Sequence, residues 1–158
     1  MTDDISFARL PRIAPAEIAA HMSDPRLALH MPLLVPRAWG PQDAAAFVAT
    51  KEACWARDGL GHWAFLADGR YVGWGGFQKE RGEWDFGLVL RPGDFGLGAR
   101  ITRKALAFAR ADDRIPFVTF LLPPSRRKLA ALTRIGARQI ASVDYEGVPF
   151  LKFRLETA

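Results

Sequence analysis

The chain has 158 residues, of which 49 % are hydrophobic and 25 % are charged. This length suits a single domain with its own core, and the composition is that of a folded globular protein. Cys54 is the only cysteine, which excludes an intrachain disulfide and a thiolate-rich metal site. The formal net charge of +5 permits an anionic ligand. Because the basic residues are scattered and form no long block, nucleic acid is not the expected main partner.

The N-terminal residues and the hydropathy pattern predict a cytoplasmic protein. Asp3 and Asp4 stand where a secretory signal would carry basic residues, and no apolar segment follows them. No apolar run reaches the roughly 20 residues that a membrane-spanning helix needs. We therefore expect no membrane partner, whereas a homodimer is compatible with the sequence.

The first part of the chain predicts a strand over 5–10 and then two helices. Pro15 and Pro41 each open a helix, because the fixed φ of proline suits the first helical turn. Gly59 is the expected C-terminal stop of the second helix. The segment 25–41 between the helices is rich in proline and apolar residues, and such loops often form one wall of a substrate site.

The middle of the chain predicts three antiparallel strands. Asp68-Gly69 is a strong hairpin signal between the first two of them. A helix, a strand, a second helix and two closing strands should follow. The strands are expected over 62–67, 70–77, 83–90, 117–122, 139–145 and 148–155, and the helices after Gly98 and from Ser125 to Gly136.

Residues 83–122 form a predicted strand-helix-strand unit, whose two strands should be parallel with a right-handed crossover. In such a unit the helix begins at the carboxyl end of the first strand, and its unpaired N–H groups form an anion site. Gly96 and Gly98 have no side chain that would keep a phosphate away from the backbone, and Arg100 adds a cation nearby. The spacing matches neither the Rossmann fingerprint nor a P-loop. The alternative is a glycine turn that merely starts a helix.

A second basic cluster occupies the expected first turn of the next helix. Arg126, Arg127 and Lys128 oppose the helix dipole there, so they are either solvated or adjacent to an anion. A ligand whose phosphates reach from one helix start to the other would account for both basic clusters. Coenzyme A (CoA) has this shape, and its pantetheine arm could follow the strand over 83–90.

With these motifs the chain resembles the GNAT acetyltransferases, especially the bacterial branch of the ribosomal-protein N-terminal acetyltransferases. The resemblance covers nearly the whole chain, which we expect to form one domain over residues 1–158. It implies an α/β fold with a mixed, splayed sheet of about seven strands, helices on both faces, and acetyl-CoA as co-substrate. The motifs that carry it are Asp85-Phe86-Gly87-Leu88-Val89-Leu90-Arg91-Pro92, Phe95-Gly96-Leu97-Gly98, and residues 125–136 followed by two strands.

The resemblance also implies a set of CoA-binding residues. The backbone of the strand expected over 83–90 should pair with the pantetheine arm, and the amides of the turn over 95–100 should hold the pyrophosphate. The implied contacts are Leu88, Val89, Leu90, Phe95, Gly96, Leu97, Gly98, Ala99 and Arg100. The charge argument adds Arg91, Arg127 and Lys128 as candidate contacts to the phosphates, and Ser125 is added because it stands where relatives have a CoA-contacting asparagine.

Several positions depart from the family pattern. Only Gly98 matches the central glycine of the pyrophosphate loop, and Arg100 stands where glycine or alanine is usual. Ser125 replaces a common asparagine. Leu132 lies where many relatives place a tyrosine as general acid. These departures affect the expected mechanism more than the expected fold.

Amide formation from a thioester requires a neutral amine, whereas alkylamines like that of lysine titrate near ~10.4. A base must therefore accept the proton, directly or through water. Asp85 is the first candidate, Glu83 lies on the same strand face, and Tyr145 is a candidate acid, although each could instead be an ordinary polar residue. His62 has a suitable pKa, but a structural or surface role is the simpler interpretation. No histidines share a ligand spacing, so we expect no metal.

The expected reaction is direct transfer in a ternary complex, with a backbone N–H near Leu88 or Val89 polarising the thioester carbonyl. The acceptor is a primary amine, either of a small molecule or of a protein N-terminus. Two alternatives remain open. One is a non-catalytic CoA-binding or regulatory module that kept the fold but lost its acid. The other is a nucleic-acid-associated basic protein.

Overall fold

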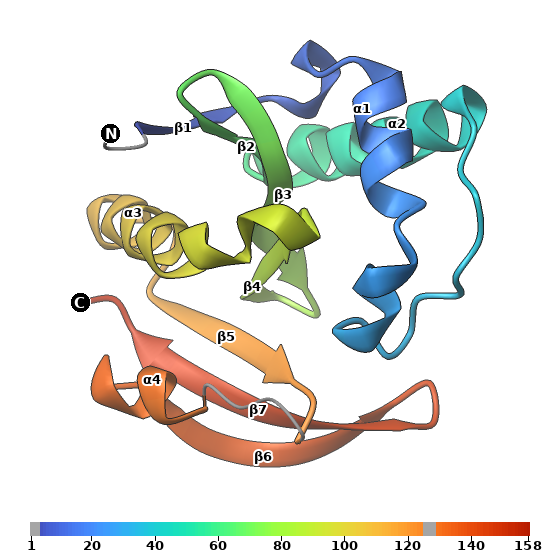
Figure 1. The fold of residues 1–158 in the computed structure, drawn as a ribbon. Coiled ribbons are helices and arrows are strands. Elements are labelled where there is room, and N and C mark those ends of the chain that lie inside the picture. The colour runs from blue at the N-terminus through green and yellow to red at the C-terminus, as the bar shows by residue number, and fades with distance from the viewer. Residues whose placement is uncertain (1–3, 125–128) are drawn as a thin grey trace.

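The computed structural model describes residues 4–124 and 129–158, and Figure 1 shows the fold. Within these residues the strands form one sheet of seven, in the order β1-β2-β3-β4-β5-β7-β6. Neighbours pair antiparallel except β4 and β5, which are parallel as predicted. The strands are β1 (Ile5–Ala8), β2 (His62–Ala67), β3 (Arg70–Glu80), β4 (Glu83–Leu90), β5 (Phe117–Leu122), β6 (Arg138–Tyr145) and β7 (Val148–Glu156).

Local sequence signals account for the hairpins and the helix starts. Asp68 and Gly69 have φ of 51° and 79°, the left-handed geometry that matches the right-handed twist of the flanking strands. Pro15 and Pro41 occupy the first turns of α1 (Pro15–Met22) and α2 (Pro41–Asp58). The hairpin at Asp68-Gly69 and the helix starts at Pro15 and Pro41 are therefore confirmed.

Helices cover both faces of the sheet, as expected (Figure 1). The helices α1 and α2 pack on one face, where Ile18 and Ala44 are buried with Tyr71 and Trp74 of β3. The other face carries α3 (Gly98–Ala111) and α4 (Leu129–Arg134). The described residues also include three short 3-10 helices, η1 (Leu10–Arg12), η2 (Pro25–Leu29) and η3 (Pro92–Leu97). None of the helices described here is long and apolar enough to cross a membrane.

Alternation along β4 decides which of its side chains reach which face. Trp84, Phe86 and Leu90 are buried in the core beneath α3. Val89 packs instead against the core beneath α1 and α2. Because strand side chains alternate with period two, Asp85 lies on the same face as Val89. The carboxylate therefore faces the α1–α2 side of the sheet.

The centre of the sheet is tightly built where β3 meets β4. Gly75 has a φ of 151°, and a Cβ atom placed on it would lie 2.1 Å from the carbonyl oxygen of Gly87. No side chain fits between the two backbones at this point. The close approach holds the middle of β4 against β3.

The sheet opens on the other side of β4. The strands β4 and β5 pair at Asp85 and Thr119. Beyond this residue pair the two strands separate toward their carboxyl ends (Figure 1). The opening is the predicted splay of the sheet. It leaves the carboxyl half of β4, Gly87 to Leu90, with β3 as its paired neighbour.

Candidate active site

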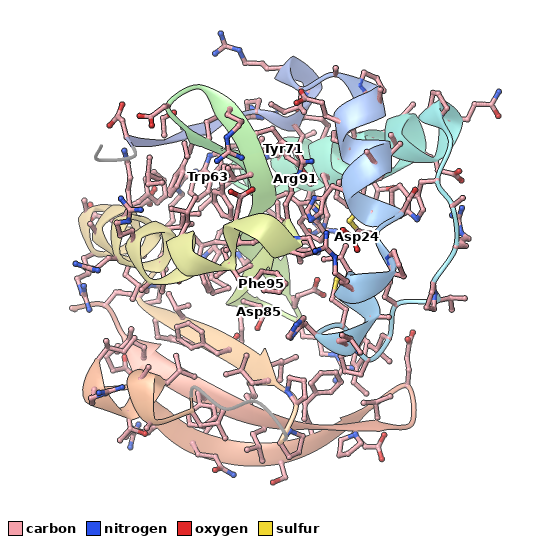
Figure 2. All side chains as sticks on the ribbon, viewed as in Figure 1. Asp24, Trp63, Tyr71, Asp85, Arg91 and Phe95 are labelled. Carbon is pink, nitrogen blue, oxygen red and sulfur yellow. The ribbon has the colours of Figure 1, made fainter. Side chains whose placement is uncertain are left out.

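Asp85 lies at the point where β4 and β5 diverge, and Figure 2 labels it there. Its Oδ1 accepts a hydrogen bond from Thr119 Oγ1 at 3.1 Å. Burial raises the pKa of Asp85 to about 7, against the lowering effect of the Thr119 hydrogen bond, and the charges of Glu80 and Glu83 raise it further. A carboxylate whose pKa lies near neutrality can take up or release a proton under working conditions.

Glu83 shares this face of β4, as the alternation predicts, but it has a cationic partner. Lys152 Nζ on β7 lies 3.1 Å from Glu83 Oε1. This ion pair reaches across β5 at the base of the opening. Of the two predicted carboxylates, Asp85 is the one without a salt bridge among the described residues.

Lys51 and Gln78 border the site on its α2 side. Lys51 Nζ donates to Gln78 Oε1 at 3.0 Å and lies 4.8 Å from the centre of a Trp74 ring. Burial lowers the pKa of Lys51. Gln78 is paired with Asp85 in the β3–β4 register, so a network from α2 reaches the residue beside the carboxylate. Sequence reasoning did not single out either residue, because their contact depends on how α2 packs.

His62 is a third residue whose position at the site was not predicted from the sequence. Its ring lies beside Gly87, two residues beyond Asp85 on the same face, and a Cβ on Gly87 would lie 3.4 Å from His62 Cε1 and Nε2. The side chain is 6 % exposed, which excludes the surface role that the sequence left open. Burial lowers the pKa of His62 well below its ordinary value, and the charge of Lys51 adds to this effect.

The carboxyl end of β4 leads through a short 3-10 helix to the start of α3. Residues Pro92–Leu97 form η3, so Gly96 belongs to this 3-10 helix, and α3 begins at Gly98. A Cβ on Gly98 would lie 3.6 Å from side-chain atoms of both Leu88 and Leu90. The first turn of α3 therefore rests on β4, which is the arrangement that the predicted strand-helix-strand unit requires.

The proline-rich loop between α1 and α2 reaches this same region. The rings of His30 and Phe95 meet edge to face with their centroids 4.9 Å apart. Phe95 lies on η3 and is labelled in Figure 2. The contact joins the loop predicted as a substrate wall to the turn predicted to bind the pyrophosphate.

The remaining predicted site residues lie apart from this centre or outside the described residues. Tyr145 is exposed in the β6–β7 hairpin, separated from β4 by β5 and β7. Ser125, Arg127 and Lys128 lie outside the residues that the structure describes. Within the described ranges there is no group of three or more His, Cys, Asp or Glu residues that could hold a metal ion.

Comparison with known proteins assigns the chain to a family. The model of the acetyltransferase (GNAT) domain matches residues 9–138. The chain belongs to the GNAT acetyltransferase family. No curated protein matches the sequence significantly. The ribosomal-protein branch expected from the motifs stays a prediction.

Solved structures share the GNAT fold along nearly the whole chain. A GNAT-family protein of Bordetella pertussis superposes with a TM-score of 0.75 at 19 % identity, covering 98 % of this chain and 96 % of its own. The yncA protein of Salmonella typhimurium, solved with acetyl-CoA as its cofactor, has a TM-score of 0.71 at 14 % identity, with coverage of 100 % and 95 %. An aminoglycoside acetyltransferase solved with coenzyme A has a TM-score of 0.70 at 10 % identity, with coverage of 98 % and 95 %.

Proposed function

We propose that this GNAT protein is an acetyl-CoA-dependent N-acetyltransferase that transfers the acetyl group directly to a primary amine. The observation that carries the proposal is the position of Asp85. It is a partly buried carboxylate whose pKa is raised to about 7 mainly by desolvation, and it is located where β4 and β5 separate. Family membership supports acetyl transfer, and the carboxylate supports an acceptor that must lose a proton.

Acetyl-CoA fits the arrangement of β4, η3 and α3. The backbone of Leu88 to Leu90 lies at the opening between β4 and β5, where the pantetheine arm would pair with it. The first N–H groups of α3, from Gly98 to Arg100, would hold the pyrophosphate. The proposed contacts also include Arg91, Phe95, Gly96, Leu97, Ser125, Arg127 and Lys128.

Asp85 is proposed as the general base. The acceptor enters as an ammonium ion, and the Asp85 carboxylate takes one of its protons, so that the nitrogen lone pair can attack the thioester carbon. The C–S bond then breaks as the carbonyl re-forms, and the CoA thiolate accepts a second proton from the nitrogen, which keeps the third as the amide N–H. A thiol of roughly pKa 8.5 leaves without a strong acid, so the leucine at position 132, where relatives have a tyrosine, is compatible with turnover.

A non-catalytic CoA-binding module is the second candidate, and Leu132 is the observation that favours it. Both candidates predict binding of acetyl-CoA. They differ in turnover, which calorimetry with acetyl-CoA and desulpho-CoA followed by a panel of amines would test. Free amino acids, aminoglycosides and peptides with free N-termini would each be supplied, and thiol release would be measured. Duplex DNA in the calorimeter tests the nucleic-acid alternative.

Asp85→Asn tests the base directly. A positioned base contributes about 10²–10⁴-fold to the rate, so this variant should be slower by at least about a hundredfold and should still bind acetyl-CoA. Its rate should recover as pH rises, because solvent then deprotonates the amine. Glu83→Gln is the matched control, since it removes the neighbouring carboxylate on the same face. Its rate should still depend on the ionisation of Asp85, with the pKa moved slightly lower because the charge of Glu83 raises it. Full activity of Asp85→Asn at neutral pH would contradict the assignment.

A further inference from the structure

The position of His62 depends on two residues without side chains. His62 on β2 pairs with Gly76 on β3, and Gly76 pairs with Gly87 on β4. The imidazole approaches Gly87 from the face that also carries Asp85, with Cε1 and Nε2 each 3.4 Å from where a Cβ of Gly87 would be. The ring therefore reaches from β2 across β3, and its Nε2 edge faces β4 just beyond Asp85.

The two nitrogens of His62 have different surroundings. Among the described residues, Nδ1 has no hydrogen-bond partner and is sealed from solvent. Nε2 is the nitrogen on the Gly87 side. A buried N–H without a partner is rarer and more costly than a buried lone pair without one. The arrangement therefore favours the tautomer in which Nδ1 carries the lone pair and Nε2 carries the hydrogen.

The groups around the ring keep it neutral. Trp74 lies against it with ring centroids 5.5 Å apart. Burial disfavours a positive charge on the imidazole, and the charge of Lys51 on α2 adds to this effect, so the pKa of His62 lies well below its ordinary value. Of the two β4 carboxylates on this face, Asp85 is nearer to Gly87 along the strand and accepts a hydrogen bond from Thr119, whereas Glu83 is paired with Lys152. A neutral imidazole that keeps its proton acts as a hydrogen-bond donor, not as a base.

We infer that His62 is a catalytic hydrogen-bond donor of the acetyl-transfer site, with Nε2–H directed at the carbonyl oxygen of the acetyl group above Gly87. The inference rests on the proposed function. When the amine attacks, the carbonyl oxygen becomes negative, and a donor fixed in place stabilises it without rearrangement. The proton stays on Nε2 throughout. Asp85 takes the proton of the amine, so the two side chains have separate tasks.

Three substitutions at His62 distinguish a donor at Nε2 from packing and from a base. The terminal nitrogen of glutamine is separated from Cβ by the same number of bonds as Nε2 of histidine, and that of asparagine by the same number as Nδ1. His62→Leu fills the space without any donor. Removing one donor of this kind costs about 10²–10³-fold in kcat. We expect that loss in His62→Leu and His62→Asn, whereas His62→Gln should stay within about tenfold of the unsubstituted protein.

The controls for these variants are acetyl-CoA affinity and the thermal midpoint, which should be close to those of the unsubstituted protein. In all three variants the rate should still rise with pH as Asp85 loses its proton, because a hydrogen-bond donor at position 62 does not change which group accepts the amine proton. A His62→Gln variant as slow as His62→Leu would overturn the inference. So would full activity of His62→Leu.

Nitrogen-15 NMR of the unsubstituted protein tests the proton position without turnover. We expect a protonated Nε2 and an unprotonated Nδ1, with no titration of His62 between about pH 5.5 and pH 8. Acetyl-CoA should shift the Nε2–H signal, and desulpho-CoA, which has no acetyl group, should not. A proton on Nδ1, titration in this range, or equal shifts with both ligands would overturn the inference. A protein that binds both ligands but acetylates no amine would instead contradict the proposed function, and the proton position would still decide the tautomer.

Discussion

Asp85→Asn should stabilise the folded protein at neutral pH while it impairs catalysis. The pKa of Asp85 is about 7 in the folded state, raised from its ordinary value of 3.8 mainly by burial. Between these two values the unfolded chain has released the proton and the folded chain still holds it. The stability of the unsubstituted protein therefore falls as pH rises through this window and becomes constant above the folded pKa. Asparagine does not titrate, so the variant lacks this contribution.

The magnitude follows from the size of the shift. One pKa unit corresponds to about 1.4 kcal/mol, so stability changes by about 1.4 kcal/mol per pH unit inside the window. Between about pH 5 and about pH 7 the contribution of Asp85 should change by about 2 kcal/mol, because half of the folded molecules have already lost this proton at pH 7. The asparagine side-chain oxygen can still accept the hydrogen that Thr119 donates to Asp85 at 3.1 Å. The stability advantage of Asp85→Asn should grow by this amount across the two pH units.

Urea unfolding of both proteins at several pH values measures the effect. The slope of free energy against urea should be the same for both, which shows that the substitution changes stability and not the surface exposed on unfolding. Asp144→Asn, on the exposed strand β6, measures the effect of removing one negative charge elsewhere. If the difference between Asp85→Asn and the unsubstituted protein is the same at every pH, then the folded protein does not hold the proton on Asp85. The assignment of this carboxyl as a base near neutrality would then be wrong.

Three further substitutions test the frame around the site. Gly75→Ala should destabilise the protein by at least about 1–3 kcal/mol, because the new Cβ would lie 2.1 Å from the oxygen of Gly87; an unchanged thermal midpoint would contradict the close approach. Gly98→Asp places a negative charge at the start of α3, so acetyl-CoA affinity measured by calorimetry should fall at least tenfold, or about 1.4 kcal/mol. Unchanged affinity in a folded variant would contradict a pyrophosphate site at the start of α3. Arg100→Ala should weaken CoA more than pantetheine, since only CoA carries phosphates; equal losses would indicate an effect on stability.

Elements with a local cause were predictable from the sequence. The Asp68-Gly69 turn and the prolines at positions 15 and 41 appear where their conformational preferences place them. Alternation along 83–90 also placed Asp85 and Glu83 on one face, opposite the core side chains. Each of these predictions depends on residues that are neighbours in the sequence.

The rest of the site depends on register and packing, which single segments do not encode. The glycine-containing turn expected at the start of the helix is a 3-10 helix over Pro92–Leu97, which precedes α3. Thr119 and Lys152 meet the β4 carboxylates only because β5 and β7 pair in one particular register. His62 reaches β4 across Gly76, a relation that spans three strands. Two glycines in register across neighbouring strands are the signal that could have found it.

The pKa values of Asp85 and His62 are shifted in opposite directions by the same cause. Burial disfavours charge, so it raises the pKa of Asp85 to about 7 and lowers that of His62 well below its ordinary value. An acid shifted upward becomes a proton acceptor that works near neutrality, and an imidazole shifted downward becomes a neutral donor that does not titrate there. Thr119 holds the first group from β5, and the absence of a side chain on Gly87 leaves room for the second. Acid-base work and carbonyl polarisation can therefore be divided between two residues on one face, without a tyrosine at position 132.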